Sequence, residues 1–287
     1  MNNIYTTLGN DVKCKKIFEY ESLEELQFIL PMIQNKKYIQ IGGGSNILFR
    51  KDYDGYVLHS KIKTIDILDN NITKIGSGVK VNDYVDFCII HNLHNICLTQ
   101  IYGIPAEIGG IVVNNAAMGF KGIEPILDHI DCINLESGEL KTFDVSECEY
   151  SYRKSRFKDI HNNKWCILYA YFKHDNKKLN RKDFDIVLEN RMRNFLPVEK
   201  GKSLGCIWNC IMVDNHNKPI NGILPYLNTD EIKELKVNDA MVFKKFPCII
   251  ENTNKCSGED VYQLSQQIKN IVEIKHNIKL NYEIEII

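Results

Sequence analysis

The sequence lacks several features that define whole classes of protein. In its 287 residues no apolar run approaches the ~18 residues that a membrane helix needs. Neither sign of charge dominates, since 36 basic residues stand against 37 acidic ones, so nothing marks a surface for nucleic acid or anionic lipid. The first residues, Met1–Cys14, contain no apolar run and therefore predict no secretory signal. We expect a cytoplasmic protein with neither a nucleic-acid nor a membrane partner.

The ten cysteines do not form a metal-binding pattern. Cys206 and Cys210 are the closest pair, and no second Cys or His pair with zinc-like spacing follows them. We therefore predict no metal site. Scattered cysteines in a chain without a secretion signal are expected to be reduced thiols.

Helix and strand patterns alternate along the chain and predict an α+β fold with mixed sheets. Three helices are expected: one after a capping box at Ser22–Glu25, one over Val81–His91, and one capped by Ser257–Asp260 and stopped by Asn277. Strands are expected over Lys37–Ile41, Ile47–Arg50 and Ile278–Ile287, with a hairpin of Asp131–Asn134 and Leu140–Phe143 around Ser137-Gly138. The polar segment His174–Phe184 is the expected domain boundary.

A run of three glycines, Gly42-Gly43-Gly44, followed by Ser45 and Asn46, lies between two of these strands. Residues without a Cβ let successive backbone N–H groups turn toward one point, which makes a nest for an anion. The strand that follows excludes the dinucleotide fingerprint, which opens a helix, and no Lys-Ser/Thr pair completes a phosphate loop. The alternative interpretation is a flexible hairpin loop.

Two further small-residue segments favour a ligand. Gly103–Gly110 is followed by Val113–Ala117, and Gly76–Gly78 forms a third turn. Three such loops in the first 120 residues suit a long, flat, phosphorylated cofactor better than a single phosphate.

In this order and spacing, the loops resemble the UDP-N-acetylenolpyruvoylglucosamine reductase (UDP-N-acetylmuramate dehydrogenase) family. Its pattern has a Gly-Gly-Gly-Ser-Asn loop, a Gly-Ile-Pro-x-x-x-Gly-Gly segment ending in Asn-Ala, and a Tyr-Arg-x-Ser-x-Phe segment that Tyr152–Phe157 matches. Arg191–Pro197 and Ser203–Cys206 resemble the start of the family's substrate domain, and Ile278–Ile284 its closing strand. The match is specific in the first half and looser after Phe195.

The resemblance implies a two-subdomain FAD-binding fold of the vanillyl-alcohol-oxidase/PCMH-like type with a smaller α+β substrate domain. Residues 1–175 would bind FAD in two subdomains, about 1–65 and 66–175. Residues 190–276 would bind a nucleotide sugar, and 277–287 would return as a strand to the active site. NADPH would be the electron donor, in peptidoglycan synthesis, and the protein is expected to be a monomer.

The resemblance also assigns site residues. For FAD these are Gly42, Gly43, Gly44, Ser45, Asn46, Gly78, Ile104, Pro105, Gly109, Gly110 and Asn115. For the substrate they are Tyr152, Arg193 and Asn209.

Three residues would perform the chemistry: Arg153, Glu283 and Cys206. A guanidinium can donate two parallel hydrogen bonds to a carboxylate, so Arg153 would stabilise the negative charge on the substrate carboxylate. The alternative interpretation is that Arg153 is a solvated surface charge. Glu283 would act beside it, with Glu285 as the neighbouring rival. Cys206 stands where the family has a proton-donating serine. A thiol is more acidic than a hydroxyl and can donate a proton, but a small apolar core residue is the alternative.

The chain departs from the family near this cysteine. Ile207–Ile211 lacks the family's lysine and proline, and Val242–Asn252 lacks its histidine. Asn281 and Tyr282 replace a glutamate and a proline of the closing strand. These changes leave three hypotheses open: the cell-wall reductase, a flavoprotein of the same fold with another substrate, and a non-catalytic FAD-binding homologue.

Overall fold

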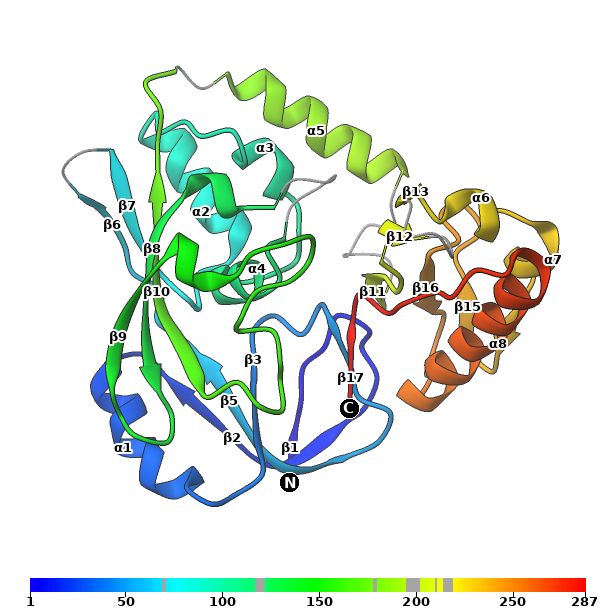
Figure 1. The fold of residues 1–287 in the computed structure, drawn as a ribbon, viewed down its shortest axis with the longest axis horizontal. Coiled ribbons are helices and arrows are strands. Elements are labelled where there is room, and N and C mark those ends of the chain that lie inside the picture. Colours follow the sequence, from blue (N-terminus) through cyan, green and yellow to red (C-terminus); the bar gives the residue numbers. More distant parts are fainter. Residues whose placement is uncertain (69–70, 117–121, 178–179, 195–201, 210, 214–218) are drawn as a thin grey trace. The chain divides into compact units, whose positions relative to one another are not determined.

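The computed structural model of this chain describes residues 1–68, 71–116, 122–177, 180–194, 202–209, 211–213 and 219–287 (Figure 1). The described chain forms two compact units. Unit 1 consists of residues 1–14, 44–53 and 191–287, and unit 2 of residues 15–43 and 54–190. The chain therefore passes between the units after residues 14, 43, 53 and 190. Neither unit is one continuous segment.

Unit 2 contains a five-stranded antiparallel sheet. Its order is β6 (Ile65–Leu68), β7 (Ile72–Gly76), β10 (Trp165–Lys173), β8 (Leu127–Asn134) and β9 (Leu140–Asp144). The accompanying helices are α2 (Val81–Ile90), α3 (Leu98–Ile101) and α4 (Ile108–Val113), with 3-10 turns at Glu124–Ile126 and Val145–Cys148. Helix α4 packs on β7 and β10. Apolar side chains from the helices and the sheet form one core.

A second sheet in unit 2 brings β2 (Lys13–Tyr20), β5 (Tyr53–Ser60) and β3 (Tyr38–Ile41) together. β3 and β5 run parallel, and helix α1 (Leu23–Ile33) contributes its buried side chains to the adjoining core. The first residues of β2 belong to unit 1, where β1 (Asn2–Asn3) pairs with them.

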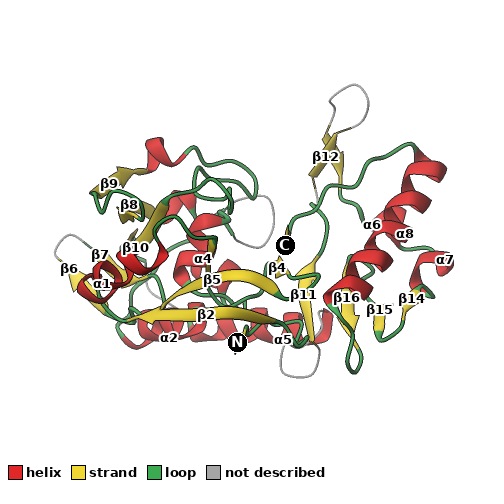
Figure 2. Ribbon diagram, turned by 90° about the horizontal axis from the view of Figure 1, so that it is seen from below, coloured by secondary structure: helices red, strands yellow, loops and turns green. Residues whose placement is uncertain are grey.

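Unit 1 is built on a four-stranded antiparallel sheet and one long helix. The sheet order is β11 (Lys202–Cys206), β16 (Ile249–Asn252), β15 (Ala240–Val242) and β14 (Lys236–Val237). Helix α8 (Gly258–His276) lies along β14 and β15 (Figure 2). The remaining elements are α6 (Leu224–Leu227), α7 (Asp230–Lys233), the pair β12 (Ile211–Val213) and β13 (Pro219–Asn221), and β4 (Ile47–Leu48), which runs parallel to β17 (Glu285–Ile286).

The structure confirms the predicted α+β composition and most predicted elements. Helices α1, α2 and α8, strand β3 and the hairpin of β8 and β9 lie where the patterns placed them. Ser257 and Asp260 form the predicted reciprocal capping box, and Asn277 ends α8 in the left-handed conformation with φ of 54°. The first capping box is only half formed: the Ser22 hydroxyl accepts from the Glu25 N–H, but the Glu25 carboxylate accepts from Glu21 instead of Ser22.

Two expectations differ from the structure. The predicted strand Ile278–Ile287 pairs as a strand only at Glu285–Ile286, although Ile278, Leu280 and Ile284 are buried as the alternation required. The polar segment His174–Phe184 is not a boundary, because Phe184 is buried in the core of unit 2 and meets Tyr102 edge to face at 5.8 Å. The junction lies instead within α5 (Arg181–Asn194), after residue 190.

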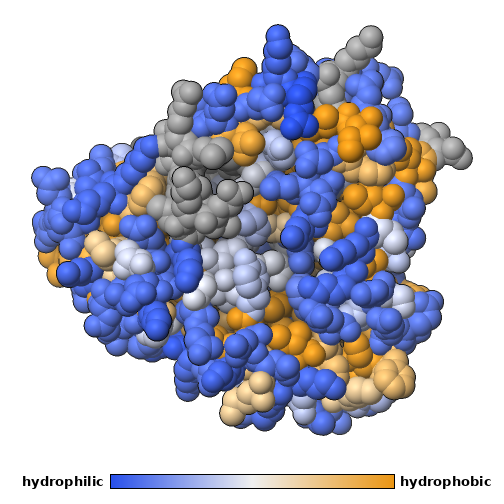
Figure 3. Space-filling model, turned by 180° about the vertical axis from the view of Figure 1, so that it is seen from behind, coloured by the Kyte–Doolittle hydropathy of each residue, from blue (hydrophilic) through white to orange (hydrophobic). Residues whose placement is uncertain are grey.

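The surface mixes polar and apolar residues. Hydrophilic residues cover most of the face in Figure 3, with apolar ones among them. Large exposed apolar side chains are scattered over separate elements: Tyr5, Phe28, Ile90, Ile96, Ile186 and Ile274. None of the helices in the described ranges has the length and apolar character required to span a membrane.

Candidate active site

Unit 2 brings the first part of the glycine loop against the second glycine segment. A Cβ added to Gly43 would lie 3.2 Å from the carbonyl oxygen of Pro105, and one on Gly42 would lie 3.3 Å from a carboxylate oxygen of Glu107. The absence of side chains thus allows the two backbones to approach each other. Two segments about 60 residues apart in the chain, predicted to act on one ligand, are neighbours in the fold.

Glu107 is a residue of this region that the motif analysis did not single out. It is buried, and its carboxylate oxygens lie 3.0 and 3.1 Å from Nε2 of His59 on β5. The other ring nitrogen of His59 lies 3.5 Å from a carboxylate oxygen of Glu19. A charged residue inside a glycine-rich segment was the available signal for Glu107, whereas nothing in the sequence points to His59.

Gly78, Gly109 and Gly110 of unit 2 differ in the space available for a side chain. Gly78 is buried, donates to the Ile62 carbonyl, and leaves no room for a Cβ beside the Ser60 carbonyl. Gly109 is tight against Ser77, with 3.1 Å between an added Cβ and the Ser77 Cβ. An added Cβ on Gly110 would meet nothing within 4 Å. Packing therefore accounts for Gly78 and Gly109, and not for Gly110.

The backbone donors of the glycine loop fit a phosphorylated cofactor. Within the described ranges, none of the N–H groups of Gly42–Ser45 donates a hydrogen bond. Unit 1 holds the second half of this loop, where Gly44 has φ of 65° and its carbonyl accepts from the Thr7 N–H. Consecutive uncommitted amides with a left-handed glycine are the chemistry of an anion nest. Such a row of amides fits the pyrophosphate of FAD.

Arg153 lies in a tight turn that is tied to the second glycine segment. Its φ is 54°, and Ser151 and Lys154 exchange backbone hydrogen bonds around it. The Asn115 side chain donates to the Ser151 carbonyl at 3.1 Å, and the Ser155 hydroxyl donates to the Val113 carbonyl at 2.6 Å. These two bonds hold the Arg153 turn at the C-terminal end of α4. Asn115 thus has a structural task in addition to its predicted role.

Tyr152 and the remaining predicted residues of this segment lie close by in unit 2. The Arg153 guanidinium carbon is 5.5 Å from the centre of the Tyr152 ring. Lys158 Nζ donates to the Arg153 carbonyl at 2.9 Å, and both Tyr152 and Arg153 are half-buried. Ile104 is half-buried, while Pro105 is exposed. A half-buried guanidinium held by its backbone suits recognition of a carboxylate better than a freely moving surface side chain does.

In unit 1 the structure brings Cys206, Asn209 and Glu283 together. The Glu283 N–H donates to the carbonyl of Ile207, one residue beyond Cys206, at 2.9 Å. Asn209 donates through its backbone to the Asn281 carbonyl at 2.9 Å and through its side chain to the Tyr282 carbonyl at 3.1 Å. The segments that carry the predicted acid and carboxylate, about 75 residues apart in sequence, thus run side by side.

The end of the glycine loop joins this cluster. Asn46 donates from its side chain to the Glu283 carbonyl at 3.3 Å, and its own carbonyl accepts from the Glu285 N–H at 3.0 Å. Both glutamates are thus fixed by backbone contacts to their neighbours, so the contacts alone do not choose between them. The side-chain oxygen of Asn209 is buried and accepts no hydrogen bond from any described residue. It is therefore a candidate acceptor for a ligand.

The departures from the family pattern pack together. Trp208 is fully buried and stacks on Tyr282 with 4.9 Å between ring centres. The Tyr282 hydroxyl lies 2.7 Å from that of Ser265 and accepts from Gln266 on α8. Burial raises the pKa of Tyr282 above its ordinary value. Tyr282, an unusual residue of the closing segment, thus has another unusual residue, Trp208, as its stacking partner.

Some predicted positions cannot be placed. The backbone of Arg193 lies in α5, but its side chain is outside the described residues, and so is Cys210. Within the described ranges, no three His, Cys, Asp or Glu side chains cluster so as to hold a metal ion.

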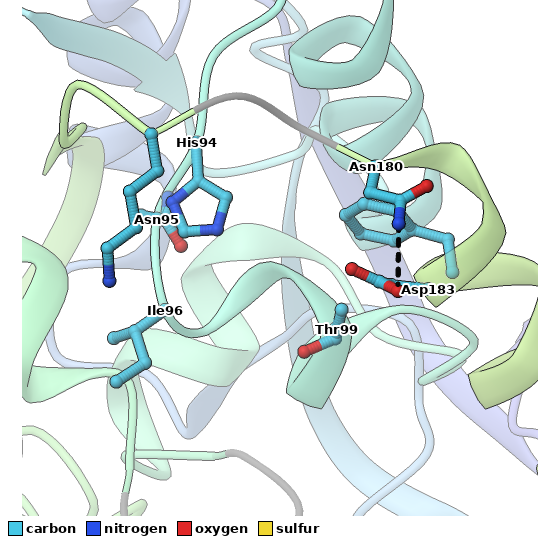
Figure 4. Close-up of a pocket in the computed structure, with 8 residues that line it drawn as sticks. His94, Asn95, Ile96, Thr99, Asn180 and Asp183 are labelled. Atoms are coloured by element: carbon cyan, nitrogen blue, oxygen red, sulfur yellow. Dashed lines mark hydrogen bonds between the residues drawn. The ribbon is translucent and has the colours of Figure 1, made fainter.

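A pocket of about 290 Å³ in unit 2 has no predicted site residue in its lining (Figure 4). Its lining comes from the segment before and within α3 and from the start of α5: His94, Asn95, Ile96, Thr99, Lys177, Asn180, Asp183 and Phe184. Two of its polar groups serve the local fold, since Asn180 donates to Asp183 and His94 Nδ1 lies 2.6 Å from Asp175, whereas the Asn95 side-chain nitrogen is buried without a hydrogen-bond partner among the described residues.

Comparison with known proteins gives consistent matches. Residues 226–287 match the family described as UDP-N-acetylenolpyruvoylglucosamine reductase, C-terminal domain. UDP-N-acetylenolpyruvoylglucosamine reductases of Bacteroides fragilis and Flavobacterium johnsoniae are 26% and 27% identical to this chain, each in an alignment 331 residues long, gaps included. Each alignment covers 99% of this chain and 97% of the relative. These matches confirm the resemblance predicted from the motifs.

The fold has a solved counterpart. The crystal structure of UDP-N-acetylenolpyruvylglucosamine reductase from Thermus caldophilus matches with a TM-score of 0.75 at 21% identity, over 98% of this chain and 95% of that one. This match confirms the predicted α+β fold.

Proposed function

Because this chain is a homologue of the UDP-N-acetylenolpyruvoylglucosamine reductases over nearly its whole length, we propose that it is an FAD-dependent reductase of peptidoglycan synthesis. Its substrate is UDP-N-acetylglucosamine enolpyruvate, its product is UDP-N-acetylmuramate, and NADPH is the electron donor. The observation that carries the proposal is the uncommitted row of amides at Gly42–Ser45, which continues through Asn46 into the segment of Glu283 and Cys206. Within unit 1, the second half of the glycine loop and the segment of the candidate proton donor are thus linked by hydrogen bonds.

The reaction requires a hydride at the β-carbon of the enolpyruvyl group and a proton at the α-carbon. FAD held by the glycine segments would supply the hydride. The chain's own task is to hold the substrate and to stabilise the negative charge that develops on the α-carbon and carboxylate. Arg153 grips that carboxylate, because a planar guanidinium can donate two parallel hydrogen bonds to it.

Cys206 donates the proton to the α-carbon and recovers one from solvent afterwards. It lies at the end of β11 and is only half-buried, so both a substrate and water can reach its thiol. Glu283, whose N–H is fixed to the Ile207 carbonyl, orients the region of the carboxylate. Asn209 and Tyr152 contribute contacts to the nucleotide sugar, and Arg193 a charge for its phosphates.

The domain assignment follows from these roles. The FAD-binding residues fall mainly in residues 1–175, the substrate contacts mainly in 190–276, and residues 277–287 return to the site with Glu283. The protein works as a cytoplasmic monomer.

The test is an anaerobic two-step reaction of the purified protein. The protein should carry a yellow, oxidised flavin, NADPH should bleach it, and UDP-N-acetylglucosamine enolpyruvate should restore the colour as UDP-N-acetylmuramate appears by mass spectrometry. A folded protein that takes up no FAD would overturn the proposal at the level of the cofactor.

A second function is favoured by the residues around Cys206, where Trp208 and Tyr282 depart from the family and stack on each other. On that alternative, NADPH bleaches the flavin but the enolpyruvyl substrate does not restore it, while another acceptor does. A flavin that no acceptor reoxidises would indicate the non-catalytic homologue.

A further inference from the structure

Cys206 and Cys248 lie on neighbouring segments of unit 1 with their sulfur atoms in contact. Cys206 ends β11, and Cys248 immediately precedes β16, the strand that pairs with β11. The Ile207 N–H donates to the Cys248 carbonyl at 2.9 Å, which fixes the two backbones. The two Sγ atoms are 3.1 Å apart, and both residues are thiols. A backbone hydrogen bond beside the pair limits how far the sulfurs can separate.

The two thiols differ in exposure. Cys206 is half-buried, whereas every other cysteine within the described ranges is buried, Cys248 being 1% exposed. A small oxidant in solution therefore reaches Cys206 first. Cys248 lies directly behind it as a second thiol, which is the arrangement of a reactive cysteine with a resolving partner.

We propose that Cys206 and Cys248 are an oxidation site, at which a hydroperoxide forms a reversible disulfide that withdraws the Cys206 thiol. The Cys206 thiol loses its proton, the thiolate attacks one oxygen of hydrogen peroxide and the O–O bond breaks. The sulfur becomes a sulfenic acid, and the departing hydroxide takes up the proton and leaves as water. The Cys248 thiol then attacks that sulfur, the S–O bond breaks, and a second water leaves. Two thiols and one peroxide thus give one disulfide and two waters, and a dithiol reductant reverses the change.

The geometry permits this bond. A disulfide joins its sulfurs at about 2.0 Å, so the pair has to close by about 1 Å, which small side-chain rotations achieve. Formation of the bridge is independent of the enzymatic activity. Its consequence rests on the proposed function, in which the Cys206 thiol delivers the proton to the substrate.

The test is oxidation of the FAD-loaded protein with a modest excess of hydrogen peroxide, followed by peptide mapping under non-reducing conditions. We expect one cross-linked peptide pair containing Cys206 and Cys248. Reductase activity should fall at least tenfold and return after a dithiol reductant. Cys248→Ser should keep the untreated activity, form no bridge, and lose activity to peroxide in a form that the reductant restores poorly, since Cys206 then oxidises further.

Cys256→Ser is the matched control, because Cys256 belongs to the same core and its thiol is buried, which raises its pKa to about 12. This variant should behave like the wild type. A bridge from Cys206 to another cysteine, or a Cys206 sulfenic acid that persists in the wild type, would overturn the proposal. Because mapping requires no turnover, a bridge found in a protein without reductase activity would contradict the proposed function alone.

Discussion

Arg153 combines an uncommon backbone conformation with a half-buried guanidinium. A φ of 54° is costly for an arginine and persists only where neighbouring contacts fix it. Here the backbone bonds of Ser151 and Lys154 and the Asn115 side chain supply those contacts. Strain at a candidate site residue supports a functional reason for the turn.

Arg153→Lys should therefore lower turnover although it keeps the charge and the same backbone strain. Lysine cannot form the second hydrogen bond to a carboxylate, and a charged hydrogen bond contributes about 1.5–3 kcal/mol, so kcat should fall roughly 10- to 100-fold. Steady-state kinetics and flavin content measure the effect, and FAD should be retained. Arg156→Lys, an exposed neighbour whose guanidinium donates to the Glu147 carbonyl, should leave kcat within about twofold. Equal losses in the two variants would contradict the role of Arg153.

Cys206 can be tested through the two half-reactions. Cys206→Ala should slow reoxidation of the reduced flavin by substrate, while reduction by NADPH stays nearly normal because no proton is then delivered to the α-carbon. Cys206→Ser should keep measurable activity, since a hydroxyl can occupy the same place. Stopped-flow absorbance separates the steps. Equal slowing of both would indicate a structural cysteine, and no change in either would assign the proton to another group or to water.

Glu283 and Glu285 provide a matched pair, because they lie two residues apart and neither is fully buried. Glu283→Gln should reduce kcat at unchanged flavin content, because an amide carries no negative charge and cannot relay a proton. Glu285→Gln should leave kcat near the wild-type value. The reverse result would transfer the role to Glu285, whose backbone N–H is bonded to the Asn46 carbonyl.

At the scale of elements, α4 carries two adjacent glycines with opposite surroundings. A Cβ on Gly109 would press on Ser77, so Gly109→Ala should destabilise the FAD-free protein by roughly 1–3 kcal/mol. Gly110 faces open space, and alanine is a better helix former by up to about 1 kcal/mol, so Gly110→Ala should leave that protein as stable or more stable. If FAD uses this space, Gly110→Ala should nevertheless weaken FAD binding. Denaturant titration and fluorescence titration with FAD distinguish the effects; undiminished FAD affinity in Gly110→Ala would exclude this position from the cofactor site.

The elements that the sequence predicted well are those whose signals are local. Helix α8 begins and ends where expected because its capping box and its left-handed Asn277 act within one turn. The closing strand was predicted too long, since strand pairing requires a partner. Residues 278–284 bury alternate side chains in the core of unit 1, but Tyr282 forms only an isolated bridge with Trp208, and the Tyr282 and Glu283 carbonyls accept from the side chains of Asn209 and Asn46.

In the candidate site, too, short local motifs were predictable and contacts between distant residues were not. The glycine segments and the Arg153 turn were predictable because each is a short motif. The pairs His59 with Glu107 and Cys206 with Cys248 are separated by 48 and 42 residues, and no local pattern brings them together. Only the folded backbone reveals that they are partners.

At the scale of the whole molecule, the chain passes four times between two units, and β2 and β5 each begin in unit 1 and continue in unit 2. Neither unit can therefore complete its strands while the other is unfolded. We expect a single calorimetric unfolding transition. FAD at about 100 times its Kd should stabilise the protein by about 2.7 kcal/mol and raise its Tm by roughly 5 °C. Two separate transitions, with FAD shifting only one, would contradict this coupling.

The core of unit 1 contains Leu8 and Leu48 among side chains that come mostly from residues beyond 200. Residues 226–287 by themselves match a family domain, yet their core also contains Leu8 and Leu48 from the first 50 residues of the chain. In evolutionary terms, we expect that this segment cannot be exchanged between homologues by itself. A chimaera that joins it to a homologue's first half would inherit foreign partners for that core, so successful recombination should require exchanging the short stretches around positions 8 and 48 along with it.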